Sequence, residues 1–356
     1  MASWRGWAAA GAAAAAGAWA VARARRRIDF AGRGVLITGG SRGLGLAIAR
    51  RFAAEGAQVA LLAREGAELT AARRDLEGRR APSVLPIVCD VRDRIQVRTA
   101  VREAAERFGR LDVVVNDAGV IQVGPLEHME RRDFEEALEV HLYGPLEVVM
   151  AALPWLREAP GGGRVVNISS LGGKLAVPHM LPYSASKHAL VGLSDGLRAE
   201  LRKYGILVTT VCPGLMRTGS APHARFKGRH RAEHAWFAVA AGLPLLTISA
   251  ERAAARIVEA CRRGQTSHYV TVPSRLSALM NELFPGLMAE LTVLTDRLLP
   301  AWAPEAGTRS WSGQESHSEW APSWATWLSD AAARRHNELT SVEGRPSAAS
   351  AGSAAG

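Results

Sequence analysis

The residues best suited to chemistry are a tyrosine and a lysine that stand four positions apart, Tyr183 and Lys187. On a helix they would share one face, because residues at i and i+4 are neighbours there. A free phenol has a pKa near 10, and an adjacent ammonium group favours the phenolate and lowers that pKa. Ser170 ends a predicted strand and can hydrogen-bond a substrate oxygen. A tyrosine–lysine pair also occurs by chance on helix surfaces, so only the three residues together predict acid–base chemistry on a hydroxyl or carbonyl group.

A glycine-rich turn near the start of the chain predicts a binding loop for a dinucleotide. Residues 38–45 read TGGSRGLG, directly after an apolar run and directly before a helical pattern. Glycine is needed where the backbone lies against a pyrophosphate, and a helix N-terminus offers free N–H donors. Glycines at such a turn also occur for packing alone, but a place on the first strand of a strand–helix series favours the dinucleotide. The predicted loop residues are Gly39, Ser41, Arg42, Gly43, Leu44 and Gly45.

The end of the second predicted strand indicates which dinucleotide binds. Enzymes that prefer NAD usually place an acidic residue there, whereas this strand ends at Arg64. Arg42 and Arg64 together suit the 2′-phosphate of NADP, because a guanidinium group is a planar charged fork. The alternative is that Arg64 is a solvated residue of an arginine-rich chain. Asp90, followed by Val91, comes after the third strand, and its carboxylate could accept a hydrogen bond from the adenine amino group.

The elements that must position these residues alternate along the chain. Apolar runs predict strands at 34–38, 59–62, 84–88, 111–115, 164–168 and 206–211, separated by segments of helix length. This alternation predicts an α/β fold with a parallel sheet that helices cover on both faces.

Several motifs in order resemble the short-chain dehydrogenase/reductase superfamily. They are the loop at 38–45, the tetrapeptide Asn116-Asp117-Ala118-Gly119, Ser170, the Tyr183/Lys187 pair, and Pro213-Gly214 followed by Thr218. The resemblance covers about residues 30–265. It implies a single doubly wound Rossmann domain, which we place at 30–300, hydride transfer at nicotinamide C4, and often a dimer or tetramer.

The resemblance also implies a role for each matching residue. Tyr183 is the general acid–base, Lys187 lowers its pKa and binds the ribose hydroxyls, and Ser170 orients the carbonyl. The remaining residues bind the cofactor, with Thr218 at the carboxamide: Asn116, Ala118, Gly119, Pro213, Gly214 and Thr218.

Two positions depart from the family pattern. Asp117 replaces an asparagine that helps to order the sheet, and we expect little catalytic effect. His141 replaces an asparagine that holds a water in the proton relay behind the lysine. The histidine could take that place and add pH sensitivity near neutrality, or it could interrupt the relay and slow turnover.

The net charge of +10 first suggests nucleic acid or an anionic membrane as a partner. No nucleic-acid-binding motif is present, so we expect no nucleic acid. Five positive charges lie in residues 1–27, where an uncharged stretch at 6–22 is followed by an arginine cluster. Seventeen helical residues span about 26 Å, the short limit for a bilayer core.

These N-terminal features predict a possible membrane anchor within residues 1–29, with the catalytic domain on the cytoplasmic side. A signal peptide, a mitochondrial transit peptide and a disordered leader are the alternatives, and with a disordered leader the protein would be cytoplasmic.

Residues 301–356 are rich in small and polar residues and predict a largely disordered tail. One helical pattern interrupts it at 323–331. Residues 217–234 hold five basic residues and one acid, next to an apolar run at 235–240. This basic segment could contact a membrane, meet an acidic group of a substrate, or be a solvated lid helix.

No metal site is expected. The three cysteines form no CxxC pair, and His223, His230 and His234 lack a metal-binding spacing. The sequence predicts an NADP(H)-dependent oxidoreductase that interconverts an alcohol and a ketone or aldehyde, on a lipophilic small molecule. The alternative is a non-catalytic NADP-binding regulator or scaffold on the same fold, which loss of Tyr183 or Lys187 would have favoured.

Overall fold

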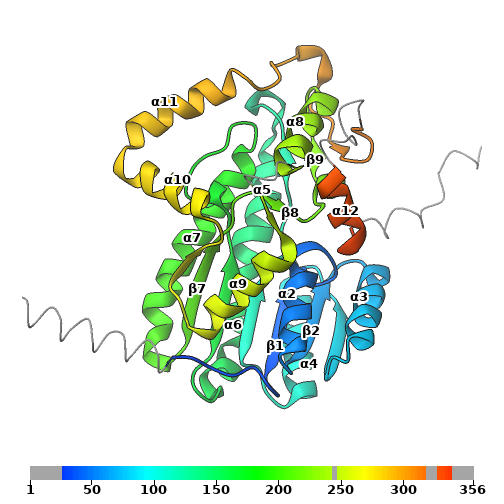
Figure 1. The fold of residues 1–356 in the computed structure, drawn as a ribbon, viewed down its shortest axis with the longest axis vertical. Coiled ribbons are helices and arrows are strands. Elements are labelled where there is room, and N and C mark those ends of the chain that lie inside the picture. The colour runs from blue at the N-terminus through cyan, green and yellow to red at the C-terminus, as the bar shows by residue number, and fades with distance from the viewer. Residues whose placement is uncertain (1–25, 243–246, 318–326, 339–356) are drawn as a thin grey trace, which may run out of the picture.

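A seven-stranded parallel sheet lies at the centre of the computed structural model, which describes residues 26–242, 247–317 and 327–338 (Figure 1). The strand order is β11-β7-β6-β4-β1-β2-β3. The strands are β1 (Gly34–Thr38), β2 (Gln58–Ala63), β3 (Ser83–Val88), β4 (Val113–Asn116), β6 (Arg164–Ile168), β7 (Leu207–Cys212) and β11 (Ser267–Tyr269). The chain winds outward from β1 in one direction and from β4 in the other, so the predicted doubly wound Rossmann fold is confirmed. Ligands of such sheets bind at this switch point, beyond the carboxyl ends of the strands.

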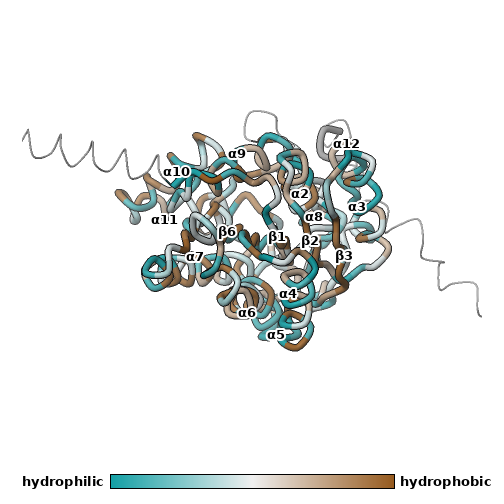
Figure 2. Tube along the Cα trace, turned by 90° about the horizontal axis from the view of Figure 1, so that it is seen from below, coloured by the Kyte–Doolittle hydropathy of each residue, from teal (hydrophilic) through white to brown (hydrophobic). Residues whose placement is uncertain are grey.

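Helices cover both faces of the sheet (Figure 2). The helices α2 (Gly43–Ala54), α3 (Gly66–Gly78) and α9 (Ala250–Arg262) bury apolar side chains against one face. The helices α4 (Arg94–Phe108), α6 (Gly144–Glu158) and α7 (Leu181–Leu201) do so against the other. The strands are apolar on both sides because each face is covered, which explains why they read as continuous apolar runs in the sequence.

Smaller elements lie above the carboxyl ends of the strands. The strands β5 (Gln122–Val123), β9 (Arg225–Phe226) and β12 (Trp311–Ser312) form a three-stranded sheet, and β8 (Met216–Arg217) pairs with β10 (Ile248–Ser249). The helices α5 (Arg131–Leu138), α8 (His230–Gly242) and α12 (Trp327–Arg335) flank them. The helical pattern at 323–331 overlaps α12 over residues 327–331, and its first four residues lie outside the described residues. The helix α12 packs against α8 and β8. Within the tail that composition predicts to be largely disordered, residues 301–317 and 327–338 therefore have defined positions on the domain.

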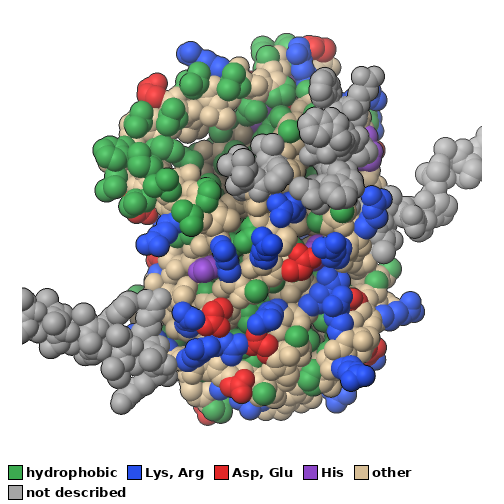
Figure 3. Space-filling view, viewed as in Figure 1, with side chains coloured by type: hydrophobic (Ala, Val, Ile, Leu, Met, Phe, Trp, Pro, Cys, Tyr) green, Lys and Arg blue, Asp and Glu red, His purple; other side chains and the backbone are tan. Residues whose placement is uncertain are grey.

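A helical hairpin, α10 (Val272–Leu283) and α11 (Pro285–Asp296), projects from the body (Figure 1). Together with Leu298 just after α11, it holds ten of the nineteen exposed large hydrophobic side chains of the described residues. Figure 3 shows them gathered at one edge of the molecule. In the described part of the chain, no helix is long and apolar enough to cross a membrane. The predicted anchor at residues 6–22 lies outside the described residues.

Candidate active site

One cavity lies at the switch point of the sheet and brings most of the predicted site residues together. Those that line it are Gly39, Ser41, Arg42, Leu44, Arg64, Asp90, Val91, Ala118, Gly119, His141, Tyr183, Lys187 and Thr218. They come from the loops after β1, β2, β3, β4 and β8, from the start of α2, from the π-helical turn Glu139–Tyr143 and from α7. Parallel strands carry their loops to one edge, so residues up to about 180 positions apart meet there.

The other predicted residues stand behind the cavity wall. A Cβ at position 45 would lie 2.2 Å from the carbonyl oxygen of Gly39, so Gly45 allows the helix to approach its own loop. The side-chain amide of Asn116 donates a hydrogen bond to Asn167 Oδ1 at 2.8 Å, which joins the neighbouring strands β4 and β6. The carbonyl of Pro213 accepts a hydrogen bond from the amide of Leu171. These residues shape the site without forming its surface.

Gly43, Gly214 and Ser170 are also outside the lining, but Gly43 and Ser170 each lie against a residue that forms it. A Cβ at position 43 would meet Glu338, and a Cβ at position 214 would meet Ser274. The Ser170 hydroxyl is hydrogen-bonded to the side chain of Tyr183, which does line the cavity.

Tyr183 and Lys187 lie one turn apart on α7, as the spacing predicts. The lysine ammonium is 5.7 Å from the centre of the tyrosine ring and donates a hydrogen bond to the carbonyl of Ile168 at 2.9 Å. Burial lowers the pKa of Lys187 to about 8. Burial raises the pKa of Tyr183, and the hydrogen bond with Ser170 offsets only part of this. In the protein itself, burial therefore outweighs the lowering of the tyrosine pKa that the sequence predicts.

Asp117 is part of the electrostatics of the site, which the sequence analysis did not anticipate. Burial raises the pKa of its carboxyl to about 8, while Lys187 favours the ionised form. In return, the Asp117 carboxylate raises the pKa of both Lys187 and Tyr183. The aspartate at this position is thus coupled to the residues that would exchange the proton.

His141 is completely buried on a π-helical turn, Glu139–Tyr143, and packs edge-on against the Tyr183 ring. Its Nε2 accepts a hydrogen bond from the amide of Val120 at 3.1 Å, so a neutral ring carries its proton on Nδ1. Nδ1 lies 2.8 Å from the Ser186 hydroxyl, which donates to the carbonyl of Tyr183. Burial, with Lys187 nearby, holds the pKa of His141 well below its usual range. These contacts favour a neutral histidine, against the pH sensitivity near neutrality that the sequence suggests.

An acidic residue that the sequence analysis missed pairs with Arg42. Glu68, in the first turn of α3, accepts a hydrogen bond from Arg42 Nη1 at 2.6 Å and another from the Ser41 hydroxyl at 2.9 Å. Arg42 Nε also lies 3.3 Å from Glu338, at the end of the described tail. Arg64, in contrast, is exposed at the rim of the cavity.

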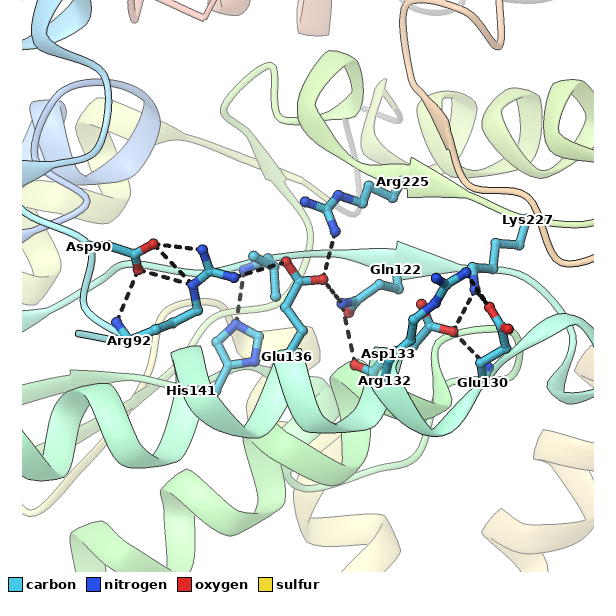
Figure 4. A network of polar contacts seen from close by, with 11 residues as sticks. Asp90, Arg92, Gln122, Glu130, Arg132, Asp133, Glu136, His141, Arg225 and Lys227 are labelled. Atoms are coloured by element: carbon cyan, nitrogen blue, oxygen red, sulfur yellow. Dashed lines mark hydrogen bonds and ion pairs between the residues drawn. The ribbon is translucent and has the colours of Figure 1, made fainter. Parts of the chain in front are cut away.

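Many of the charged side chains near the cavity form ion pairs with one another (Figure 4). Asp90, the predicted adenine partner, pairs with Arg92 at 2.6 Å, which holds the pKa of its carboxyl below its usual range. Two basic residues of the segment 217–234, Arg225 and Lys227, point toward carboxylates of α5 and the turn before it. Arg225 pairs with Glu136 and Lys227 with Asp133, both at 2.6 Å. These two charges are therefore used within the fold.

The described residues contain no group of three or more histidine, cysteine or acidic side chains that could hold a metal ion. The three cysteines are free and buried. Each of their thiols has a pKa raised chiefly by burial, as expected for inert core residues.

A doubly wound sheet with a glycine-rich first loop and a tyrosine, lysine and serine at its switch point defines the class of dinucleotide-dependent oxidoreductases. Within that class, the chain belongs to the short chain dehydrogenase family, which matches residues 33–227. It is an oxidoreductase that acts on alcohol or carbonyl groups, with a nicotinamide cofactor typical of the family.

Similar proteins act on different substrates. The chain is 37% identical over 186 residues to L-fucose dehydrogenase of Bos taurus, covering 52% of this chain and 66% of that protein. It is 38% identical over 192 residues to levodione reductase of Leifsonia aquatica, covering 53% and 71%. A short chain dehydrogenase from Mycobacterium paratuberculosis, solved bound to NAD, is 28% identical with a TM-score of 0.61, covering 68% of this chain and 97% of that chain. The match thus spans about two thirds of the curated relatives.

Proposed function

We propose that the protein is an NADP(H)-dependent oxidoreductase that interconverts a secondary alcohol and a ketone, or a primary alcohol and an aldehyde, with Tyr183 as general acid–base. The observation that carries this proposal is the grouping of Tyr183, Ser170 and Lys187 at the cavity. The loop also suits a dinucleotide: Gly39 has a φ of 71°, and a Cβ there would lie 2.9 Å from the backbone of Ala118. Only glycine allows this close approach.

The residues divide the reaction between them. The nicotinamide, when bound, supplies the hydride for reduction and accepts it in oxidation. Tyr183 Oη gives its proton to the substrate carbonyl oxygen in reduction and takes it back from the alcohol in oxidation. The Lys187 ammonium stabilises the tyrosinate that remains, and the Ser170 hydroxyl holds the substrate oxygen beside Tyr183.

Replacing the tyrosine tests this mechanism against the non-catalytic alternative. We expect Tyr183→Phe to lower kcat by at least about 100-fold, the usual loss when a positioned acid–base is removed. Tyr204→Phe is the matched control, because Tyr204 lies outside the cavity and stacks with Arg157. Turnover is measured on a panel of carbonyls and alcohols with NADPH and NADP⁺. Full turnover by Tyr183→Phe would exclude this mechanism, and a wild-type protein that binds NADP⁺ but turns over no panel member would favour the regulator.

The preference for NADP rests on Arg64, the exposed arginine at the cavity rim where an NAD enzyme would carry an acid. Arg64→Asp should lower kcat/KM for NADPH relative to NADH by about tenfold or more, because a charge-assisted contact with the 2′-phosphate contributes about 1.5–3 kcal/mol. Arg131→Asp, on the exposed surface of α5, should leave the ratio unchanged. An unchanged ratio for Arg64→Asp would remove this residue from the cofactor site.

The lipophilic substrate class is supported by an apolar cluster that packs against Tyr183. Its buried members include Phe226 of β9 and Phe237 of α8, and two further members, Ile121 and Ala224, line the cavity with Tyr183. A substrate oxygen that reaches Tyr183 therefore brings its neighbouring carbons toward apolar side chains. This arrangement favours a hydrocarbon or ring substituent beside the reacting carbon.

We also propose that the protein contacts a membrane surface through the α10–α11 hairpin as well as through residues 6–22. The hairpin and the turn after it expose two leucine-rich stripes with spacing i, i+4, i+7, i+11: Val272, Leu276, Leu279 and Leu283, then Leu287, Leu291, Leu294 and Leu298. The helix α11 has no buried residue, and an apolar surface of this kind marks a membrane or protein contact. A lipid surface is favoured because the chain carries a second apolar stretch, residues 6–22, which an arginine cluster follows.

A further inference from the structure

The last described residues of the chain are hydrogen-bonded to the glycine-rich loop. The amide of Gly43 donates to the carbonyl of His336 at 2.9 Å. The side-chain amide of Asn337 donates to the carbonyls of Ser41 at 2.9 Å and Glu68 at 3.2 Å. Residues 336–338, which we call the tail tip, thus engage the N-terminus of α2, the position where such folds bind a phosphate.

Glu338 places a carboxylate at this position. The residue is only 4% exposed and lines the same cavity as Tyr183 and Lys187. Its carboxylate lies 3.3 Å from Arg42 Nε, 3.1 Å from His223 Nε2, and only 2.5 Å from where a Cβ on Gly43 would be. An anion beside an arginine at a helix N-terminus is held by the same forces that hold a cofactor phosphate.

A phosphate bound at this position would compete with the Glu338 carboxylate for Arg42. Arg42 already faces two carboxylates, Glu68 and Glu338, and a bound phosphate would bring a third anion to the same guanidinium group. Burial and the neighbouring Glu68 and Asp117 raise the pKa of Glu338 to about 8, against the attraction of Arg42, so its carboxyl group is fully ionised only above that pH. The cavity beside the tail tip measures about 290 Å³, at the lower end of small-molecule sites, which are roughly 300–1,000 Å³.

The tail tip is held from outside the cavity by contacts that can break. Arg50 lies 3.1 Å from His336 Nδ1 and donates to the carbonyl of Arg335, and Glu251 pairs with both Arg335 and His336. Asn337 has a φ of 61°, a left-handed conformation that turns the following residue inward. The tail tip is therefore attached by these side-chain contacts with α2 and α9 and by the backbone hydrogen bond from Gly43 to His336.

We propose that Glu338 is an internal ligand of the dinucleotide site: it occupies the place of a cofactor phosphate in the free protein, leaves when the cofactor binds, and so sets the cofactor affinity. This rests on the nicotinamide cofactor of the family and on its binding at the glycine-rich loop. If the tail tip were instead a lid that closes over the bound cofactor, each of the two measurements below would give the opposite result.

Equilibrium binding of NADP⁺ to full-length protein, followed by calorimetry, tests the affinity. Above about pH 8, where the carboxyl group of Glu338 is ionised, Glu338→Gln keeps the shape of the side chain and removes its charge, and Glu338→Ala removes the carboxyl group. We expect Kd to fall about fivefold or more in both variants, the lower range of coupling between sites. Glu315→Gln is the matched control, since this exposed tail glutamate bonds only locally to Ser312 in the described structure. Unchanged or weaker binding by both Glu338 variants would overturn the proposal.

Hydrogen–deuterium exchange on the wild-type protein gives a second measurement that needs no variant. Saturating NADP⁺ should increase amide exchange in peptides that cover residues 327–338, because the tail tip is released. Protection of these peptides would identify a lid and overturn the proposal. If neither wild type nor any variant binds NADP⁺ or NAD⁺, the cofactor assignment fails and this proposal fails with it. If wild type binds the cofactor and the Glu338 variants bind it equally well, only this proposal fails.

Discussion

The tyrosine, lysine and serine of the site could be identified from the sequence because their spacing is local and their chemistry is specific. The cavity lining agrees with most of the residues assigned to the cofactor, since those assignments follow motifs at the ends of strands. Glu68 and Glu338 could not be identified in this way. Their contacts with Arg42 join residues 26 and 296 positions apart, and no local pattern marks either glutamate as a partner. The behaviour of His141 likewise depends on its burial rather than on its residue type.

Asp117 offers a test of the electrostatics at the residue scale. Its carboxylate raises the pKa of both Tyr183 and Lys187, so Asp117→Asn should lower both pKa values. Reduction needs a protonated tyrosine and fails as pH rises through the tyrosine pKa. The alkaline limb of the kcat/KM profile for reduction should therefore move to lower pH, by an amount on the order of one unit.

The measurement is the pH dependence of kcat/KM for wild type and Asp117→Asn with one carbonyl substrate. Asp93→Asn is a suitable control, because this helix-capping aspartate lies outside the cavity lining. A limb that stays in place, or moves to higher pH, would show that Asp117 does not act on the proton donor.

At the scale of elements, the apolar runs at 34–38 and 164–168 have the same bounds as β1 and β6. The strand predicted at 111–115 is β4 at Val113–Asn116, although the backbone of Asp112 already bonds to Gly34 and Arg164 on the two neighbouring strands. The edge strand β11 escaped prediction because Ser267–Tyr269 has no apolar run and pairs only with β7. Such edge elements depend on tertiary pairing, which a local pattern does not encode.

The ion pairs of α5 give a prediction about stability at the same scale. Lys227 is only 2% exposed and pairs with Asp133, which is also buried. Lys227→Ala should lower the free energy of unfolding by about 3–5 kcal/mol, because it leaves a buried carboxylate without its partner. Arg225→Ala breaks a more exposed pair with Glu136, and should cost at most about 1 kcal/mol. Urea unfolding measures both, and equal losses would show that burial does not separate the two pairs.

At the scale of the whole molecule, the net charge of +10 is distributed among separate sites rather than forming one surface. Arg42 is paired with Glu68 at the cavity, while Arg225 and Lys227 hold α5 against β9. Because Arg225 and Lys227 are paired, the segment 217–234 has fewer free positive charges for binding an anionic membrane than its composition suggests. The apolar surface of α10 and α11 is therefore the more direct candidate for membrane contact.

Vesicle flotation separates the two proposed membrane contacts. A protein that begins at Ile28 lacks the apolar stretch at 6–22 but keeps the hairpin, so we expect it to float with phosphatidylcholine vesicles. Leu294→Asp in that shortened protein should release it, because a charge in the stripe opposes insertion into the apolar layer. Ile95→Asp, at an even more exposed apolar position on α4, is the matched control and should float normally.

The outcomes of this experiment distinguish the two contacts. If only the full-length protein floats, the contact belongs to residues before Ile28. If Leu294→Asp and Ile95→Asp release the shortened protein equally, the hairpin has no special role. Retention of every form in the unfloated fraction would exclude both contacts, since the stripes of α10 and α11 would then face water or another protein.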